Sequence, residues 1–83
     1  MNKKYTTTRA LALRIAELLT QQGISQYELA KRSILSETTI SGIMNERWKT
    51  STLTTIERIS DGFGLSISQF FDSPYFDHDK FND

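Results

Sequence analysis

Residues 23 to 45 read GISQYELAKRSILSETTISGIMN, and this stretch constrains the fold more than any other part of the chain. It contains two short helix patterns, and each begins with a residue that can cap a helix. Ser25 followed by Glu28 has the spacing of a capping box, in which the hydroxyl and the carboxylate each accept a hydrogen bond from the backbone N–H of the other residue. Ser36 is a second N-cap candidate. We therefore expect helices over residues 26–33 and 37–44, separated by a short turn.

The apolar residues of this stretch indicate that the two helices pack against each other at a steep angle. Ala30 is small where the second helix must approach closely. Ile40 and Ile43 are three residues apart and share one face of the second helix. This pattern is typical of a helix-turn-helix, whose second helix lies in the major groove of DNA.

The rest of the chain predicts three more helices, over about 9–22, 53–63 and 67–71, and no alternating strand pattern. The expected N-caps are Thr7 or Thr8, Thr52 and Ser66, the last forming a capping box with Gln69. The expected left-handed helix ends are Gly23, Asn45 and Gly64, and Gly62 is expected to let a neighbouring helix pack closely.

The single proline, Pro74, should break any further helix, so the tail is expected to be irregular. The predicted fold class is therefore all-α. A compact five-helix domain over residues 9–71 is expected between an N-terminal arm (1–8) and an acidic tail that contains aromatic residues (72–83).

Composition limits the possible classes of function. The chain has 83 residues and no cysteine, which fits one domain in a reducing cytoplasm and excludes a disulfide scaffold. No apolar run approaches the roughly 20 residues of a membrane span, and the first residues lack the apolar stretch of a signal peptide. His78 is the only histidine, and no nucleophile–base pair or zinc-ligand spacing is present. We expect no enzyme activity, no metal and no cofactor.

The charge distribution matters because nucleic-acid binders usually carry a basic surface. Ten basic and ten acidic residues give a formal net charge of zero. Residues 72–83 hold four aspartates and one lysine, a charge of −3, which leaves residues 1–71 with nine basic and six acidic residues, a charge of +3. A moderately basic body still suits DNA, provided that the acidic tail lies away from the interface.

Three strings of this chain resemble one known family. They are LRIAELLTQQGISQYELAKRS, LSETTISGIMN and TLTTIERISDGFGLSISQFF, and they follow one another in the family's order and spacing. Residues 23–26, 39–41 and 63–66 carry its most typical matches. The chain thus resembles the lambda-repressor/Cro-like (Xre-type) helix-turn-helix family over residues 9–71. The resemblance implies a compact five-helix DNA-binding domain, usually a dimer on a two-fold operator.

The chain departs from the family pattern at three places. Ile34 replaces a common turn glycine, so the turn is expected to take a conformation that a β-branched residue allows. Met44 replaces a glutamate that in some members pairs with an arginine of the first helix, matched here by Arg14, so Arg14 is expected to be free to reach a phosphate. The recognition helix begins with acidic and hydroxyl side chains (Glu37, Thr38 and Thr39) where the family often has Arg, Lys or Gln.

Apart from Arg14, the candidate contacts with the DNA backbone fall into two groups. Gln26 and Tyr27 begin the helix expected over residues 26–33, where an amide or a hydroxyl can bind a phosphate. Partial packing on the helix expected over residues 9–22 is an equal alternative for Tyr27. A second set of backbone contacts is expected just after the recognition helix, where cations and hydrogen-bond donors gather: Asn45, Arg47, Lys49 and Thr50. Trp48 either donates to a phosphate there or pins the loop to the core.

Base contacts are expected from Thr38, Thr39 and Gly42, which we place on the polar face of the recognition helix opposite its isoleucines. A threonine hydroxyl can bond to several bases, and Gly42 would let the helix approach DNA closely. The alternative for Thr39 is a bond from its hydroxyl to a preceding carbonyl. Glu37 either accepts from a cytosine amino group or stabilises the helix N-terminus through its dipole, and we prefer the dipole.

The last fourteen residues carry more aromatic residues than a small core needs. Phe71, Tyr75, Phe76 and Phe81 are expected to form an apolar dimer surface. The alternative is that the tail folds back over its own domain.

The leading hypothesis is therefore a small transcriptional regulator, a repressor, that binds a double-stranded DNA operator as a homodimer. A second hypothesis is a protein-interaction module on the same fold, such as an antitoxin-like or anti-repressor partner with weak or no DNA binding. The acidic start of the recognition helix, the zero net charge and the aromatic tail favour that alternative.

Overall fold

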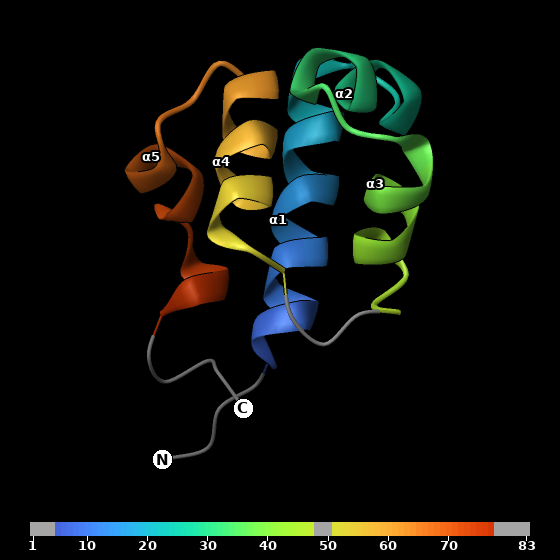
Figure 1. Cartoon of the computed structure of the whole chain (residues 1–83). Coiled ribbons are helices and arrows are strands. Elements are labelled where there is room, and N and C mark those ends of the chain that lie inside the picture. Colours follow the sequence, from blue (N-terminus) through green and yellow to red (C-terminus); the bar gives the residue numbers. More distant parts are fainter. Residues whose placement is uncertain (1–4, 48–50, 78–83) are drawn as a thin grey trace.

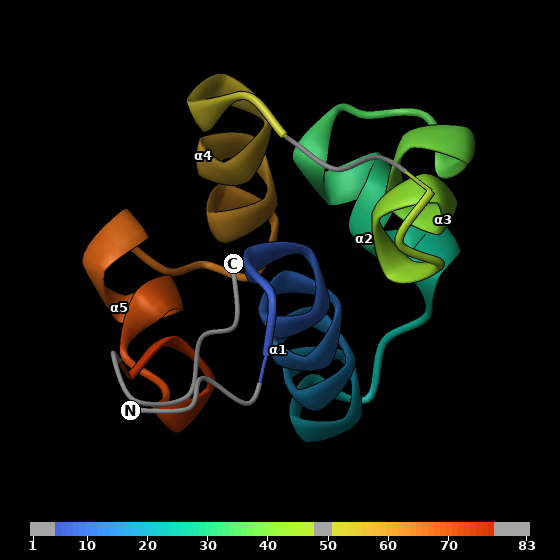
Figure 2. The ribbon, with the colours of Figure 1, turned by 90° about the horizontal axis from the view of Figure 1, so that it is seen from below.

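The computed structural model describes residues 5–47 and 51–77, and these residues fold into five α-helices and one short 3-10 helix. The elements are α1 (Thr7–Gln22), α2 (Gln26–Ser33), α3 (Glu37–Met44), α4 (Leu53–Gly62), α5 (Ile67–Phe71) and η1 (Pro74–Phe76). Figures 1 and 2 show α1 in the middle of the molecule, between α5 on one side and α2 and α3 on the other. The prediction of an all-α, five-helix fold is confirmed.

One hydrophobic core joins all five α-helices, because each contributes a side chain that is fully removed from solvent. These are Ile15, Leu29, Ile40, Ile59 and Phe70, one from each helix in chain order. Helix α2 packs mainly against α4, and α3 packs against both α1 and α2. The α2–α3 pair is therefore held in a fixed position by the rest of the domain.

Each α-helix begins at a serine or threonine whose side chain accepts a hydrogen bond from a backbone N–H of the first turn. The N-caps are Thr6, Ser25, Ser36, Thr52 and Ser66. Thr6 replaces the predicted Thr7 or Thr8, so α1 begins earlier than expected.

Of the two predicted capping boxes, only the one at Ser66 is complete, with Gln69 as its partner. At Ser25 only half of the box forms. The carboxylate of Glu28 instead accepts a hydrogen bond from Nε of Arg32 at 3.0 Å, one turn further along α2.

The helix ends correct two predictions. Ile34, which follows α2, has φ 56° and lies in the left-handed region, where a β-branched residue is strained. Two hydrogen bonds of a Schellman motif hold it there, from the N–H of Ile34 to the carbonyl of Lys31 and from the N–H of Leu35 to the carbonyl of Ala30. At the end of α3 the left-handed residue is Glu46, with φ 57°, and not Asn45, with φ −94°.

The prediction that Gly62 allows close packing is confirmed. A Cβ atom at this position would overlap Oγ of Ser33 and would lie 3.1 Å from Cδ1 of Leu29, both on α2. Helices α2 and α4 can therefore approach this closely only because Gly62 has no side chain.

Within the described part of the tail, residues 74–76 form the helix η1, which corrects the prediction that this segment is irregular. Pro74 occupies the start of η1, where its missing N–H is not needed. Phe71 and Phe76 pack against the core, with their ring centres 4.7 Å apart, and the ring of Tyr75 meets that of Tyr5 edge-on at 5.8 Å. These three predicted dimer residues thus cover their own domain, as in the alternative stated above; Phe81 lies outside the described residues.

None of the helices in residues 5–47 and 51–77 is long and apolar enough to cross a membrane.

Candidate nucleic-acid interface

Helix α3 presents a polar face on the outside of the molecule. Ile40 and Ile43 are buried against the core, whereas Glu37 and Thr38 are exposed and Ser41 is half-buried. Thr38 and Ser41 are three residues apart, so their side chains lie on neighbouring turns of one helix face. A short, polar, exposed helix face of this kind is suited to hydrogen bonding with base edges.

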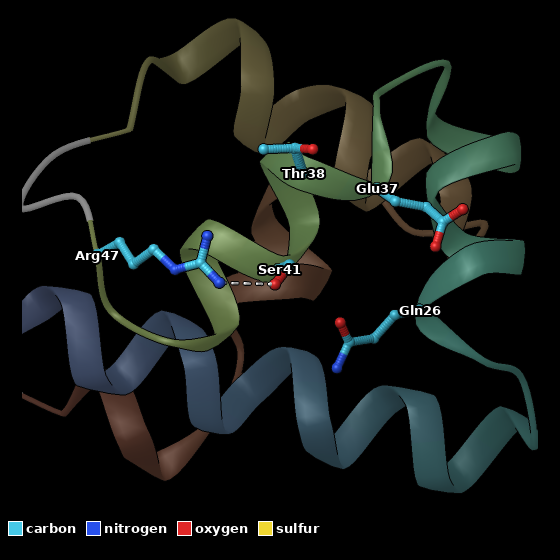
Figure 3. A pocket seen from close by; sticks show the side chains of 5 residues that line it. All are labelled: Gln26, Glu37, Thr38, Ser41 and Arg47. Atoms are coloured by element: carbon cyan, nitrogen blue, oxygen red, sulfur yellow. Dashed lines mark hydrogen bonds between the residues drawn. The ribbon is translucent and has the colours of Figure 1, made fainter.

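A polar depression of about 400 Å³ lies between this face and its neighbours (Figure 3). It is lined by side chains from the start of α2, from α3 and from the turn after α3: Gln26, Glu37, Thr38, Ser41 and Arg47. Four of the five are residues that the sequence predicted as DNA contacts. The fold thus brings together Gln26 and Arg47, which are far apart in the sequence, beside the outer face of α3.

Ser41 is the one lining residue that sequence reasoning did not select as a contact. Its carbonyl and hydroxyl oxygens accept hydrogen bonds from Nδ2 of Asn45 at 2.8 and 3.1 Å, and its hydroxyl also lies 3.4 Å from a guanidinium nitrogen of Arg47. Ser41 therefore fixes the two side chains that follow α3. The sequence could have indicated that Ser41 belongs to the site, because it lies one helical turn after Thr38 and one turn before Asn45.

The turn after α3 is tied to the start of α1. Glu46 accepts a hydrogen bond from Arg9 at 2.8 Å, and the N–H of Arg47 donates to the carbonyl of Gly42 at 2.9 Å. The hydrogen bond to Glu46, together with its charge, raises the pKa of Arg9 above its ordinary value. These contacts hold the backbone of Arg47 at the edge of the depression.

The predicted role of Arg14 is wrong. Its side chain is buried, and Nε donates to the carbonyl of Phe70 at 2.7 Å while the terminal nitrogens donate to Gln69 at 2.9 Å and to Glu17 at 2.7 Å. Because these acceptors use the guanidinium inside the protein, Arg14 is not free to reach a phosphate. It joins α1 to α5 instead.

Two predicted base contacts on α3 also differ from expectation. Gly42 is buried, because it has no side chain to extend outward and the returning chain at Arg47 lies against its carbonyl. The hydroxyl of Thr39 is 2.9 Å from that of Ser36, so it belongs to the N-cap and not to the open face; its partner is a hydroxyl, where the alternative had named a carbonyl. Thr38 and Ser41 are left as the hydroxyl groups that line the depression.

Tyr27 is 56% exposed beside Gln26, and the ammonium of Lys31 lies 5.8 Å from the centre of its ring. More than half of its side chain is thus open to solvent. Three other residues considered as backbone contacts or loop anchors, Trp48, Lys49 and Thr50, lie outside the described residues.

Comparison with known proteins agrees with this geometry. The family model for the Cro/C1-type helix-turn-helix DNA-binding domain matches residues 14–74, which include α2, α3 and the depression. The chain belongs to this family. Helices α2 and α3 are its helix-turn-helix, and the resemblance inferred from the sequence is confirmed. The family is a class of DNA-binding domains and not a class of enzymes.

Individual relatives support the same conclusion. The HTH-type transcriptional regulator PuuR of Escherichia coli K12 is 34% identical over 61 residues, which cover 74% of this chain and 32% of that regulator. The chain thus spans about a third of the length of this relative. The crystal structure of prophage Lp1 protein 11 is 28% identical, with a TM-score of 0.77 over 89% of this chain and 97% of that chain. The restriction-modification controller protein C.Esp1396I is 29% identical, with a TM-score of 0.72 over 78% of this chain and 83% of that chain.

Proposed function

We propose that this chain is a transcriptional repressor that binds a two-fold double-stranded operator as a homodimer, with α3 of each subunit in the major groove. The observation that carries the proposal is the depression beside α3, where a face for base contacts adjoins two side chains suited to phosphates. Thr38 and Ser41 would meet base edges, while Gln26 and Arg47 would hold the sugar-phosphate backbone on either side.

The start of α2 supports the phosphate contact proposed for Gln26. Ser25 accepts from the N–H of Glu28 alone, so earlier N–H groups of the first turn remain available to an anion. Gln26 is exposed at that point, and its side-chain amide can donate to the same phosphate oxygen.

On the other side of the depression, Arg47 supplies a cation whose backbone is fixed by its bond to Gly42 and whose guanidinium lies near Ser41. Lys49 and Thr50 follow it in the sequence and are proposed to extend this contact along the backbone. Asn45 is exposed beside Arg47 and can donate to the same strand.

A dimer is proposed because one recognition helix is too short to select a single site. Two short hydroxyl side chains and one carboxylate per subunit can distinguish only a few base pairs. Two copies of α3 placed about 34 Å apart would read half-sites one helical turn apart and multiply the discrimination. Since Phe71, Tyr75 and Phe76 pack within their own domain, the proposed dimer does not depend on them.

The test is selection from a pool of random duplexes by the full-length chain, followed by sequencing and by affinity measurements at two or more salt concentrations. The proposal predicts an enriched two-fold motif. It also predicts an affinity that falls steeply with salt, with about 3–5 phosphate contacts per subunit, each adding close to one unit to the slope of log affinity against log salt. A pool that stays random after repeated rounds, or an affinity that does not change with salt, would refute it and would favour a protein-interaction module.

A further inference from the structure

The feature of the depression that a DNA-binding surface explains least well is Glu37. It is the first residue of α3, it is exposed, and it lines the depression together with Gln26 (Figure 3). The ion pairs of the described residues are Arg9–Glu46, Arg14–Glu17 and Arg32–Glu28, so Glu37 belongs to none of them. A carboxylate thus faces the region where DNA would lie.

A carboxylate in this position is costly beside phosphates unless it finds a hydrogen-bond donor. Bringing it against DNA removes water from it, and an acceptor that is desolvated without a partner destabilises the complex. Arg47 lines the same depression, but its guanidinium is directed toward Ser41 (Figure 3). At the N-terminus of α3 the hydroxyl of Ser36 accepts from the N–H of Thr39, which leaves the helix dipole as the only partner of Glu37 within the described residues. The DNA itself is the other source of donors.

The major groove offers two amino groups, N4 of cytosine and N6 of adenine. Adenine also presents the acceptor N7 next to its amino group, which repels a carboxylate, whereas cytosine has no acceptor on that edge. Guanine and thymine present oxygen acceptors in the same place. A carboxylate at the start of a recognition helix therefore selects cytosine and disfavours the other three bases.

We infer that Glu37 reads one cytosine in each half-site by accepting a hydrogen bond from its N4 amino group. This inference rests on the proposed binding of duplex DNA and adds a base identity to it. The groove contact is placed at the Gln26 side of the depression, and Thr38 and Ser41 are left for the adjoining base pairs.

The experiment compares the wild type with Glu37→Gln and with a matched control, Glu57→Gln. Glu57 is an exposed carboxylate on α4, outside the depression, so the control makes the same change in net charge. Each protein is put through selection from random duplexes, and circular dichroism checks that each is folded. The wild type and the control should enrich one invariant cytosine per half-site. Glu37→Gln should lose that preference, since an amide can both donate and accept.

A chemical substitution in the DNA sharpens the test. Duplexes are made with 2-pyrimidinone, a cytosine that lacks its amino group, at the invariant position, and in parallel at a cytosine that the selection shows to be unimportant. The wild type should lose about 5- to 100-fold in affinity at the first position relative to the second, the range expected for one base contact. Glu37→Gln should show a clearly smaller difference between the two duplexes, because its neutral amide oxygen is a weaker acceptor for the amino group than the carboxylate is.

The outcomes separate this inference from the function on which it rests. An enriched wild-type motif that is identical in Glu37→Gln, accompanied only by a lower melting temperature, would overturn the inference and assign Glu37 to the helix dipole. A wild-type motif with adenine, guanine or thymine as the base that changes in Glu37→Gln would overturn it as well. A wild-type chain that enriches no motif would overturn the proposed function and this inference with it.

Discussion

Replacing Arg14 with methionine should destabilise the domain without changing how the folded protein binds DNA. Arg14 is the one charged side chain that is buried among residues 5–47 and 51–77, and its guanidinium donates to the carbonyls of Phe70 and Gln69 and to the carboxylate of Glu17. Methionine keeps most of the apolar stem but cannot donate to any of these acceptors. The carbonyl of Phe70 would be left buried without its donor.

The magnitude follows from these contacts. A hydrogen bond that involves a charged group contributes about 1.5–3 kcal/mol, and an acceptor left unsatisfied costs about 1–3 kcal/mol. The contact with Phe70 is buried, whereas those with Gln69 and Glu17 are part-buried and contribute less. We expect Arg14→Met to lower the free energy of unfolding by about 2–4 kcal/mol. For a domain of this size, with a total stability of about 4–12 kcal/mol, the melting temperature should fall by about 10–30 °C.

The assay is urea unfolding followed by circular dichroism, with Arg32→Met as the control. Arg32 makes an exposed pair with Glu28 on α2, so its replacement should cost only about 0.5 kcal/mol. DNA affinity is then measured below the melting temperature of both variants and should equal that of the wild type. The reasoning is refuted if Arg14→Met is as stable as Arg32→Met, or if it stays folded and loses DNA affinity, as a phosphate contact would.

Three further variants test other parts of the fold by urea unfolding. Ile34→Gly should raise the free energy of unfolding by about 0.5 kcal/mol. The left-handed strain that glycine relieves, roughly 1–2 kcal/mol, is larger than the entropic cost of adding a glycine to the unfolded chain. Little packing is lost, because the side chain of Ile34 is 81% exposed. A loss of stability would contradict this. Gly62→Ala should lower the free energy of unfolding by about 1–2 kcal/mol, because overlap with Ser33 outweighs the better helix propensity of alanine, so a stabilised variant would refute the close contact. Phe76→Ala should cost about 1–3 kcal/mol and leave the sedimentation coefficient unchanged, since Phe76 packs on its own core; a stable variant with an altered oligomeric state would restore the tail as a dimer surface.

The sequence predicted best what depends on neighbouring residues. The bounds of α2 and α3 match the prediction residue for residue, because Ser25 and Ser36 cap them locally and the isoleucine spacing marks the buried side of α3. The same local logic located Gly62 as a close-packing position. Cap and periodicity signals act within one or two turns, which is why a single sequence reveals them.

The sequence failed where a residue's role is decided by a distant partner or by backbone strain. Arg14 meets Phe70 and Gln69, more than fifty residues away, and nothing near Arg14 indicates this contact. Ile34 adopts a left-handed conformation that local preference disfavours, because packing of the turn and two backbone hydrogen bonds enforce it. For Phe76, the apolar character was evident, but whether it covers its own domain or a second copy depends on where the chain turns after α5.

In the candidate site, helix position predicted the exposed residues Gln26, Thr38 and Arg47 but not Ser41, whose importance comes from its contacts with the turn that follows α3. The prediction that Gly42 lies on the exposed face of α3 was wrong. Helical periodicity gives the direction in which a side chain points, but glycine has no side chain, and the segment at Arg47 covers its backbone.

The most direct test of the account distinguishes two roles. Helix α3 should contact the bases, and the turn after α3 should contact the sugar-phosphate backbone of the DNA. Affinities of the wild type, Thr38→Val and Arg47→Ala are measured for the selected operator and for a scrambled duplex at several salt concentrations. Arg47→Ala should weaken binding to both duplexes by the same factor and reduce the salt slope by about one unit. Thr38→Val should leave the scrambled duplex unaffected and weaken the operator by about tenfold. If Arg47→Ala instead changes which duplex is preferred while Thr38→Val changes neither affinity, α3 is not the helix that reads the operator.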